Sequence, residues 1–395
     1  GATVEERVIE TGEGRDEVNV HNGASLNFAK IETGGGDDVV KFEHKTTNPL
    51  QGYSYSAATE TEINMGDGND TVNLQGMGNS GNYAGRVSDF QGANIDMGDN
   101  GIKHVQIDAG KVETTNIKSG SGDDRVEIQG DSLMEGRNSV STGEGDDVVT
   151  IKDSAVKGQN STSKTTIDTD EGNDKITAEN SILDKVDINA GNGANEVTLG
   201  ENSTFKDVRV TTGKDVDTIN IESNMTGSAN NRSDSIVSTN AGNDNINIKS
   251  GVTLTNTTVN TGAGEENVEL DGVKFVNSEL FTEGDNDTVT ISNSKFENAT
   301  TSGYSSGVGT GDGEDTVTVN SGAEFKQGTY LYTGADADTI NVNSGATFNK
   351  ADINAAEGDD KISINDGAQI QSGSRIIGGE GNDTYIFSKG DGEDR

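Results

Sequence analysis

The chain has 395 residues, of which 29% are hydrophobic, 4% are aromatic and 54 are glycine. A globular domain of this length normally buries far more large apolar side chains, so the composition favours either disorder or a thin repeat. The net charge of −39 argues against nucleic acid and anionic membranes as partners and favours bound cations.

Targeting and stabilising features are sparse. No stretch approaches the roughly 18 consecutive apolar residues of a membrane span, and the first ten residues, GATVEERVIE, lack the regions of a secretory signal. We therefore expect no membrane insertion and see no N-terminal export signal. Cysteine is absent, so a metal is the expected substitute for disulfides as the device that stabilises a small core.

A phrase of the form GxGxDxUxU, in which U is aliphatic, recurs from one end of the chain to the other. Clear copies are GDGNDTVNL at 66–74, GEGDDVVTI at 143–151 and GDGEDTVTV at 311–319. We call the last Asp of each phrase, or the residue aligned with it, the marker. The markers are Asp16, Asp38, Asp70, Lys103, Asp124, Asp147, Asp174, Asn195, Asp217, Asp244, Glu266, Asp287, Asp315, Asp338, Asp360 and Asp383. Most successive markers lie 21 to 23 residues apart, and longer gaps contain insertions.

Each unit reads as a set of short strands. Apolar residues alternate after the marker, as at Val72 and Leu74, which is the period of a strand with one buried face. A turn, a stretch such as GASLNF (23–28) and a second alternating run precede the next phrase. The pattern predicts two or three strands per unit in an all-β, right-handed parallel β-helix or β-roll of about 16 coils of roughly 22 residues.

The insertions are polar and are predicted to project as loops. They span 49–60, 76–91, 154–165, 224–235 and 297–308. Tyr53, Tyr55, Tyr83 and Tyr304 lie on them. These side chains either contact carbohydrate or protein, or pack their own loops onto the coils.

Stacked coils would place the marker carboxylates in one column at intervals of about 4.8 Å. Adjacent unit charges at that distance repel by about 3–4 kcal/mol at an effective dielectric near 20, so we expect divalent cations between successive turns. The lack of Cys and the presence of only 3 His disfavour zinc and copper. Asp side chains and carbonyls of Gly-rich turns suit calcium better than magnesium. The sequence therefore predicts multiple calcium ions.

The phrase resembles the RTX, or haemolysin-type, calcium-binding repeat, whose unit reads GGxGxDxUx. The likeness covers nearly the whole chain and is closest in GGEGNDTYIFSKGDGED at 378–394. We therefore divide the chain into a β-solenoid at 1–377 and the truncated start of an RTX-like calcium-binding segment at 378–395.

In that family, turn carbonyls and the Asp of one coil share an ion with the next coil. The resemblance implies carboxylate ligands at Asp16, Asp38, Asp70, Asp124, Asp147, Asp174, Asp217, Asp244, Glu266, Asp287, Asp315, Asp338, Asp360, Asp383 and Asp394. It implies turn ligands around Gly66, Gly68, Gly120, Gly122, Gly143, Gly145, Gly311, Gly313, Gly379 and Gly381. Here the phrase occurs once per coil, so the ions should form a column on one edge only. Lys103 and Asn195 occupy marker positions, and we expect missing or weaker ions beside them.

No catalytic constellation is evident. His21, His44 and His104 lie on different units without a repeated partner, and calcium and solvation account for the many carboxylate pairs. We therefore predict a non-enzymatic, extracellular structural region of a secreted bacterial surface protein, an adhesin stalk or surface-layer scaffold, that folds on binding calcium.

The resemblance implies type I export. The alternatives are a polysaccharide-processing β-helix enzyme and the calcium-binding segment of an RTX toxin. Beyond calcium, other copies of the chain, a host or matrix protein and a glycan are candidate partners, and nucleic acid is not.

Overall fold

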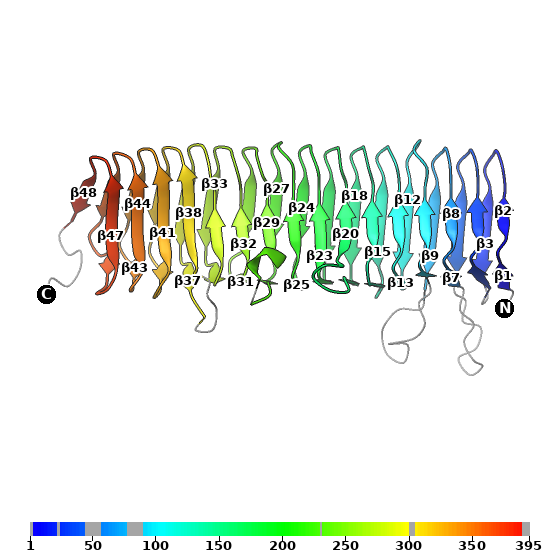
Figure 1. Cartoon of the computed structure of the whole chain (residues 1–395), viewed down its shortest axis with the longest axis horizontal. Coiled ribbons are helices and arrows are strands. Elements are labelled where there is room, and N and C mark those ends of the chain that lie inside the picture. The colour runs from blue at the N-terminus through cyan, green and yellow to red at the C-terminus, as the bar shows by residue number, and fades with distance from the viewer. Residues whose placement is uncertain are drawn as a thin grey trace. The chain divides into compact units, whose positions relative to one another are not determined.

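The computed structural model describes residues 3–21, 24–43, 57–76, 90–229, 231–299 and 305–388. The chain divides into two compact units, Gly1–Thr204 and Phe205–Arg395. Within each unit the chain winds as a parallel β-solenoid in which every coil supplies three strands (Figure 1). The predicted all-β solenoid is thereby confirmed, with three strands per coil.

The first unit has its strands in the following order. The first sheet contains β1 (Thr3–Glu5), β4 (Ser25–Asn27), β7 (Ala57–Thr59), β10 (Phe90–Gln91), β13 (Lys111–Glu113), β16 (Leu133–Glu135), β19 (Ala155–Lys157) and β22 (Ile182–Asp184). The second contains β2 (Val8–Glu10), β5 (Lys30–Glu32), β8 (Glu62–Asn64), β11 (Asn94–Asp96), β14 (Asn116–Lys118), β17 (Ser139–Ser141), β20 (Thr165–Asp168) and β23 (Val186–Asn189). The third contains β3 (Glu17–His21), β6 (Val39–Glu43), β9 (Thr71–Gln75), β12 (His104–Asp108), β15 (Arg125–Gln129), β18 (Val148–Lys152), β21 (Lys175–Glu179) and β24 (Glu196–Leu199).

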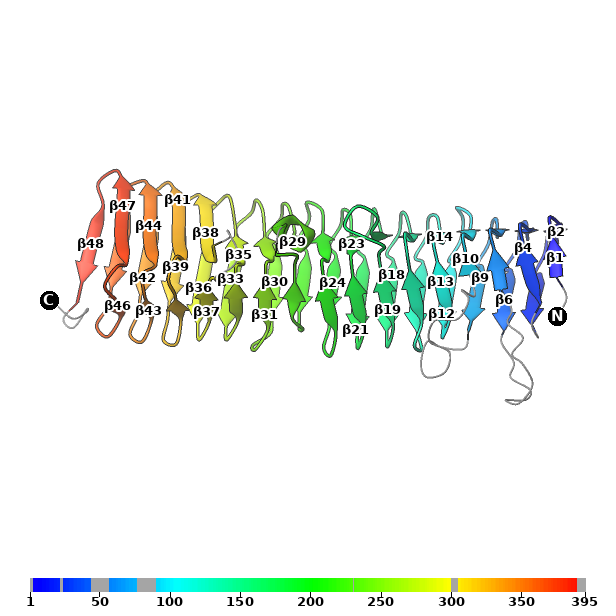
Figure 2. The ribbon, with the colours of Figure 1, turned by 60° about the horizontal axis from the view of Figure 1, so that its bottom comes forward.

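The second unit repeats this arrangement. Its first sheet contains β25 (Thr204–Lys206), β28 (Met225–Thr226), β31 (Thr253–Thr255), β34 (Lys274–Val276), β37 (Lys295–Glu297), β40 (Glu324–Phe325), β43 (Thr347–Phe348) and β46 (Gln369–Ile370). The second sheet contains β26 (Arg209–Thr211), β29 (Ile236–Ser238), β32 (Thr258–Asn260), β35 (Glu279–Phe281), β38 (Gly307–Asp312), β41 (Tyr330–Ala335), β44 (Asp352–Glu357) and β47 (Arg375–Glu380). The third strands belong to two sheets, one with β27 (Thr218–Ile221) and β30 (Asn245–Ile248), and another with β33 (Asn267–Asp271), β36 (Thr288–Ser292), β39 (Thr316–Val319), β42 (Thr339–Val342), β45 (Lys361–Ile364) and β48 (Thr384–Phe387). Figure 2 shows β38, β41, β44 and β47 side by side.

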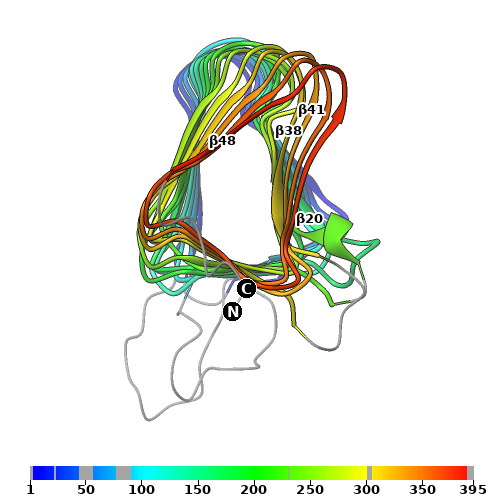
Figure 3. The same ribbon diagram turned by 90° about the vertical axis from the view of Figure 1, so that its left-hand side faces the viewer.

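The core of each unit consists of columns of inward-facing apolar residues. Val72, Val105 and Val126 pair in register through successive third strands, and all three are fully buried. Figure 3 shows the strands of the coils arranged around the interior of the solenoid. A few buried side chains per coil therefore form a continuous core, which reconciles the low hydrophobic content with a folded state.

A stack of four phenylalanines fills the core of the second unit beneath its first sheet. Successive ring centroids of Phe275, Phe296, Phe325 and Phe348 lie 4.8, 4.4 and 4.5 Å apart, with nearly parallel ring planes. All four side chains are fully buried. The stack follows from placing Phe at the same inward position of four successive coils.

The insertions are shorter than the sequence suggested, because strands β7, β10, β19 and β28 occupy parts of them. A 3₁₀ helix, η2 (Arg232–Asp234), lies in another part, and Arg232 forms an ion pair with Glu279. Tyr53, Tyr55, Tyr83 and Tyr304 lie outside the described residues. At the carboxyl end, β47 and β48 continue the coils of the second unit through Phe387.

Candidate metal site at the stacked turns

The markers lie at the turn that joins the second and third strands of each coil. Asp147, for example, directly precedes β18. The markers from Asp38 to Asp360 are all buried, whereas Asp16 and Asp383 are half-buried. The sequence predicted the column of carboxylates but not its burial. These acids therefore belong to the interior of the turn stack, where an uncompensated charge is costly.

Backbone amides hold the carboxylates in line. The N–H of Asp124 donates to Oδ1 of Asp147 at 2.8 Å, and the N–H of Asp147 donates to Oδ1 of Asp174 at 2.8 Å. The same bond joins further pairs of successive markers at 2.7 to 3.3 Å: Asp16 to Asp38, Asp38 to Asp70, Lys103 to Asp124, Asp217 to Asp244, Glu266 to Asp287, Asp287 to Asp315, Asp315 to Asp338, Asp338 to Asp360 and Asp360 to Asp383. Each amide thus fixes one oxygen of the carboxylate in the following coil.

The second carboxylate oxygen makes no such hydrogen bond. The buried Oδ2 atoms of Asp16, Asp38, Asp124, Asp147, Asp174, Asp244, Asp287, Asp315, Asp338 and Asp360 make no hydrogen bond of normal geometry with the described residues, although a hydroxyl such as that of Thr142, beside Asp147, lies close enough to lower the carboxyl pKa. Glu266 has both carboxylate oxygens in this condition. A buried acceptor without a partner is rare in folded proteins because it forfeits the hydrogen bonds that water would supply. The same orphaned oxygen recurs at one position of the turn in successive coils.

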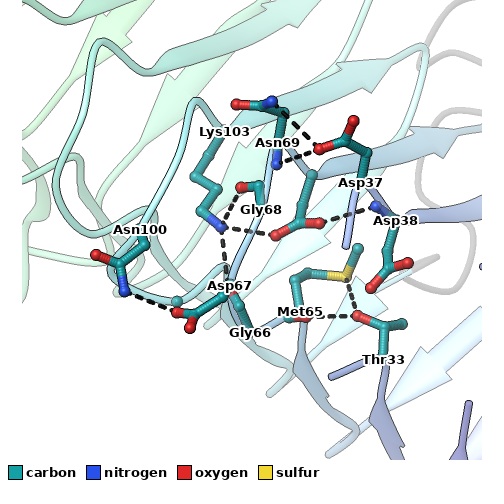
Figure 4. A network of polar contacts seen from close by, with 12 residues as sticks. Thr33, Asp37, Asp38, Met65, Gly66, Asp67, Gly68, Asn69, Asn100 and Lys103 are labelled. Carbon is teal, nitrogen blue, oxygen red and sulfur yellow. Dashed lines mark hydrogen bonds and ion pairs between the residues drawn. The ribbon is translucent and has the colours of Figure 1, made fainter. Parts of the chain in front are cut away.

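Asp70 differs from these markers because Lys103 reaches back to it from the next coil. Nζ of Lys103 lies 2.6 Å from Oδ2 of Asp70, 2.9 Å from the carbonyl oxygen of Gly66 and 2.8 Å from that of Gly68 (Figure 4). Both charged side chains are fully buried. The ammonium therefore identifies three convergent oxygens in the turn: the marker carboxylate and the carbonyls two and four residues before it.

Asn195 uses the same two carbonyl positions within its own turn. Its Nδ2 donates to the carbonyl oxygens of Gly191 at 3.1 Å and Gly193 at 2.9 Å, and its Oδ1 accepts the amide of Asp174 at 2.9 Å. The Asn side chain thus keeps the amide ladder and supplies N–H groups where Asp has an oxygen. We call the marker Oδ2 with the carbonyls two and four residues before it the oxygen cradle.

Left-handed backbone conformations build this turn. Gly143 and Gly145, four and two residues before Asp147, have φ of 93° and 131°. Asp170 and Ala356 occupy the first of these positions in other coils and also have positive φ, at 63° and 80°. The turn geometry therefore persists where the glycine of the phrase is replaced, although such residues adopt this conformation less readily.

Burial makes the marker carboxylates weaker acids. Burial, with a smaller contribution from Asp124 and Asp174, raises the pKa of Asp147 to about 7. Burial likewise raises the pKa of Asp338 to about 7 and those of Asp124, Asp174 and Asp244 to about 6. Burial and the neighbouring charge of Asp287 raise the pKa of Glu266 strongly. The carboxylates of these turns therefore resist full ionisation.

The structure brings the predicted ligands together within each unit, with one exception. Asp394 lies outside the described residues. Gly66, Gly68, Gly120, Gly122, Gly143, Gly145, Gly311, Gly313, Gly379 and Gly381 occupy the two turn positions before their markers. No cluster of three or more His, Cys, Asp or Glu side chains with metal-ligand geometry occurs in the described part of the chain. The cradle instead combines one carboxylate per turn with backbone carbonyls.

Two other features bear on catalysis. Nε2 of His104 lies 3.0 Å from Oε2 of Glu127, His21 is exposed on another coil, and His44 lies outside the described ranges.

A shallow hollow of about 290 Å³ lies on the outer face of the second sheet in the second unit. Its lining is Phe281, Glu283, Gly309, Thr310, Gly311, Asp312 and Tyr332, which includes no basic side chain.

Comparisons with known proteins give no family. No protein-family profile matches the chain, and no curated protein sequence matches it. Among solved structures, the chain is similar to the PL6 family alginate lyase AlyGC at 9% identity and a TM-score of 0.22, over 96% of both chains. A mutant of that enzyme matches at 7% identity and a TM-score of 0.14, over 96% of this chain and 97% of that one. Likenesses this weak carry no argument about activity.

Within the described ranges, no helical segment has the length and hydropathy needed to span a bilayer.

Proposed function

We propose that the chain is a calcium-binding structural repeat region of a secreted bacterial surface protein of the RTX type, an adhesin stalk or surface-layer scaffold that folds on binding calcium. The observation that carries the proposal is the Lys103 ammonium, which is held by Gly66, Gly68 and Asp70 in a cradle that other coils repeat. A group of oxygens that accommodates one buried cation is suited to others.

The residues present fit a hard divalent cation. In the coil of Asp147, the ligands would be Oδ2 of Asp147 and the carbonyl oxygens of Gly143 and Gly145, with the next coil close enough to contribute. All three ligands are oxygen atoms, which calcium prefers. Oδ2 of Asp147 makes no hydrogen bond with the described residues, so it is available to a cation. A bound calcium ion would neutralise the carboxylates and link neighbouring turns.

Calcium would couple binding to folding. The chain carries a net charge of −39, and its coils bury acids that resist ionisation. Where free calcium is scarce, the repulsion between these acids opposes stacking, whereas millimolar calcium outside a cell favours the folded state by mass action. This difference supports an extracellular location and passage through an exporter in an extended form.

Circular dichroism during a calcium titration of EDTA-treated protein, with a parallel magnesium titration, tests the proposal. We expect a cooperative gain of β-structure with calcium and little change with magnesium. If EDTA leaves the spectrum and melting temperature unaltered and calorimetry detects no calcium binding, the proposed function is wrong.

We also propose that the chain has no catalytic role, and the polysaccharide-processing alternative has a direct assay. The hollow around Phe281 and Tyr332 is the surface where a sugar could stack, and Glu283 and Asp312 are the carboxylates beside it. Incubation with neutral and acidic polysaccharides, followed by detection of new reducing ends and of unsaturated products, should give no turnover. Turnover that Glu283→Gln abolishes would favour the enzyme instead.

A further inference from the structure

Lys103 connects three successive coils of the first unit through two different groups. Its side chain runs to the preceding turn, where Nζ contacts Gly66, Gly68 and Asp70. Its backbone N–H donates to Oδ1 of Asp124 in the following coil at 2.7 Å. One residue therefore supplies both the cation for the turn before it and the usual amide bond to the turn after it.

The ammonium satisfies the chemistry of the cradle without a metal. A lysine ammonium has three donors and no acceptor, and three oxygens lie within 2.9 Å of Nζ. The side chain is 0% exposed. A buried Lys–Asp pair keeps its charges only when the geometry and the additional hydrogen bonds compensate for desolvation, and the two glycine carbonyls provide these bonds.

Two further hydrogen bonds join the same pair of turns. Nδ2 of Asn100 donates to Oδ1 of Asp67 at 2.8 Å, and the N–H of Ile102 donates to Oδ1 of Asn69 at 2.9 Å. Oδ2 of Asp70 is thus paired with a group of the chain, whereas Oδ2 of Asp38 and of Asp124 makes no hydrogen bond with the described residues.

We infer that Lys103 is a tethered substitute for one metal ion, which makes the coils around it fold without calcium and serve as the nucleus on which the calcium-dependent coils of the first unit stack. The inference rests on the proposed calcium binding. It divides the coils of the first unit into those that fold without calcium and those that need it. In a linear repeat array, stability is carried between neighbouring coils and folding propagates from a nucleus, so a metal-independent contact between two coils is a place from which propagation can start in both directions.

Asn195 supports the inference that a side chain can replace the metal ion, and it does so with an amide in place of an ammonium. Its amide donates to Gly191 and Gly193, the positions that correspond to Gly66 and Gly68. The amide is neutral, so it removes the carboxylate rather than neutralising it. Two unrelated side chains at marker positions of the first unit thus direct N–H groups to equivalent carbonyls.

The test uses the full chain and two readouts, calcium stoichiometry by calorimetry and hydrogen exchange by mass spectrometry in EDTA and in calcium. In wild type we expect exchange protection in EDTA within 66–76 and 90–108 and little protection in the coils around Asp147. Lys103→Asp should add at least one calcium ion per chain, because it frees the cradle of Asp70 and restores a marker carboxylate at 103. It should also abolish the EDTA protection, with protection restored by calcium. Lys103→Met should lose the EDTA protection, because its side chain has no N–H group to donate to the oxygens of Gly66, Gly68 and Asp70.

Lys152→Asp is the matched control, since it makes the same charge change on an exposed side chain at the end of β18. It should leave the stoichiometry and the EDTA protection unchanged. If wild type binds calcium but Lys103→Asp retains both the wild-type stoichiometry and the protection at 66–76, the inference is wrong while the proposed function stands. If wild type binds no calcium, the proposed function fails, and the EDTA protection and its loss in Lys103→Met then test the nucleus alone.

Discussion

The backbone amide of Asp124 donates a 2.8 Å hydrogen bond to Oδ1 of Asp147, while Oδ2 of Asp147 is buried and makes no hydrogen bond with the described residues. Asn195 shows what an amide does at the equivalent position, since its Oδ1 accepts the ladder bond and its Nδ2 donates to the turn carbonyls. The Asp side chain thus leaves one oxygen open to a cation, whereas an Asn side chain would place an N–H group at that position.

Asp147→Asn should therefore stabilise the calcium-free protein and weaken its response to calcium. We expect a gain of about 1–3 kcal/mol in local stability without calcium, the usual cost of an unsatisfied buried polar group. We also expect one ion fewer at saturation. Hydrogen exchange of β18 in EDTA and calcium calorimetry measure the two effects. The exposed neighbour gives the control, since Asp146→Asn should change neither quantity.

The opposite result is informative. If Asp147→Asn lowers the calcium-free stability and keeps the wild-type ion count, Oδ2 has a partner other than a cation, and the cradle is misassigned.

The repeat made much of this arrangement predictable. Alternation at Val72 and Leu74 gave the inward face of a third strand, and the spacing of the Asp markers gave the column in which they stack. The reach of Lys103 was not predictable, because an alignment places it in the column of markers whereas its ammonium lies in the turn of the preceding coil. The burial of Asp147 was missed because a Gly-Asp turn is normally solvated. Asn195, which has the same shape as Asp, was the one sign in the sequence that an N–H donor can occupy the position of a marker carboxylate oxygen.

Calcium-free stability should depend on pH through the marker carboxylates. Burial raises the pKa of Asp147 and Asp338 to about 7, above the unfolded value of about 3.9. Between about pH 4 and pH 7 the folded state thus binds more protons than the unfolded chain, and its stability falls as the pH rises. Circular dichroism in EDTA at several pH values should show the β-structure content decreasing as the pH rises across this window.

Calcium should reverse that trend, because the ion competes with protons for the same carboxylates. The apparent calcium affinity should rise between about pH 6 and pH 8 as the carboxyls of Asp147 and Asp338 lose their protons. Calorimetric titrations across this range provide the measurement. An affinity independent of pH would mean that the buried markers are not the ligands.

Glu266 should release a proton when its coil binds calcium at neutral pH. Both of its carboxylate oxygens are buried without a described donor, and burial with the charge of Asp287 raises the pKa of Glu266. Glu266→Asp shortens the side chain to that of the other markers and should reduce the protons released. Calorimetry at pH 7 in two buffers of different protonation enthalpy counts these protons. The exposed neighbour supplies a matched variant, Glu265→Asp, which should behave as wild type.

The phenylalanine stack should govern the local stability of the second unit. Phe296 is fully buried between Phe275 and Phe325, at 4.8 and 4.4 Å. Phe296→Ala should cost about 3–5 kcal/mol because it leaves a cavity in the core. Hydrogen exchange of β34, β37 and β40 should report the loss. Phe281→Ala, on the half-buried outer face, should cost clearly less, and equal losses would show that stacking in the core column is not what stabilises these coils.

The close approach of stacked turns should make one glycine intolerant of a side chain that its counterpart accepts. Gly145 and Gly14 both lie two residues before a marker, with φ of 131° and 122°. A Cβ on Gly145 would lie 2.2 Å from the carbonyl oxygen of Gly122, whereas a Cβ on Gly14 would meet nothing within 4 Å. Both Ala variants carry the same backbone strain, and only Gly145→Ala adds a clash with the backbone of the neighbouring coil.

Gly145→Ala should therefore lower the thermal midpoint and weaken calcium binding, because it displaces a cradle carbonyl, while Gly14→Ala should have the smaller effect on both. Thermal denaturation monitored by circular dichroism, with and without calcium, compares the variants. Equal destabilisation would assign the cost to the left-handed backbone alone. A larger loss in Gly145→Ala would show that the contact between turns, rather than the conformation of a single turn, sets which residues the phrase accepts.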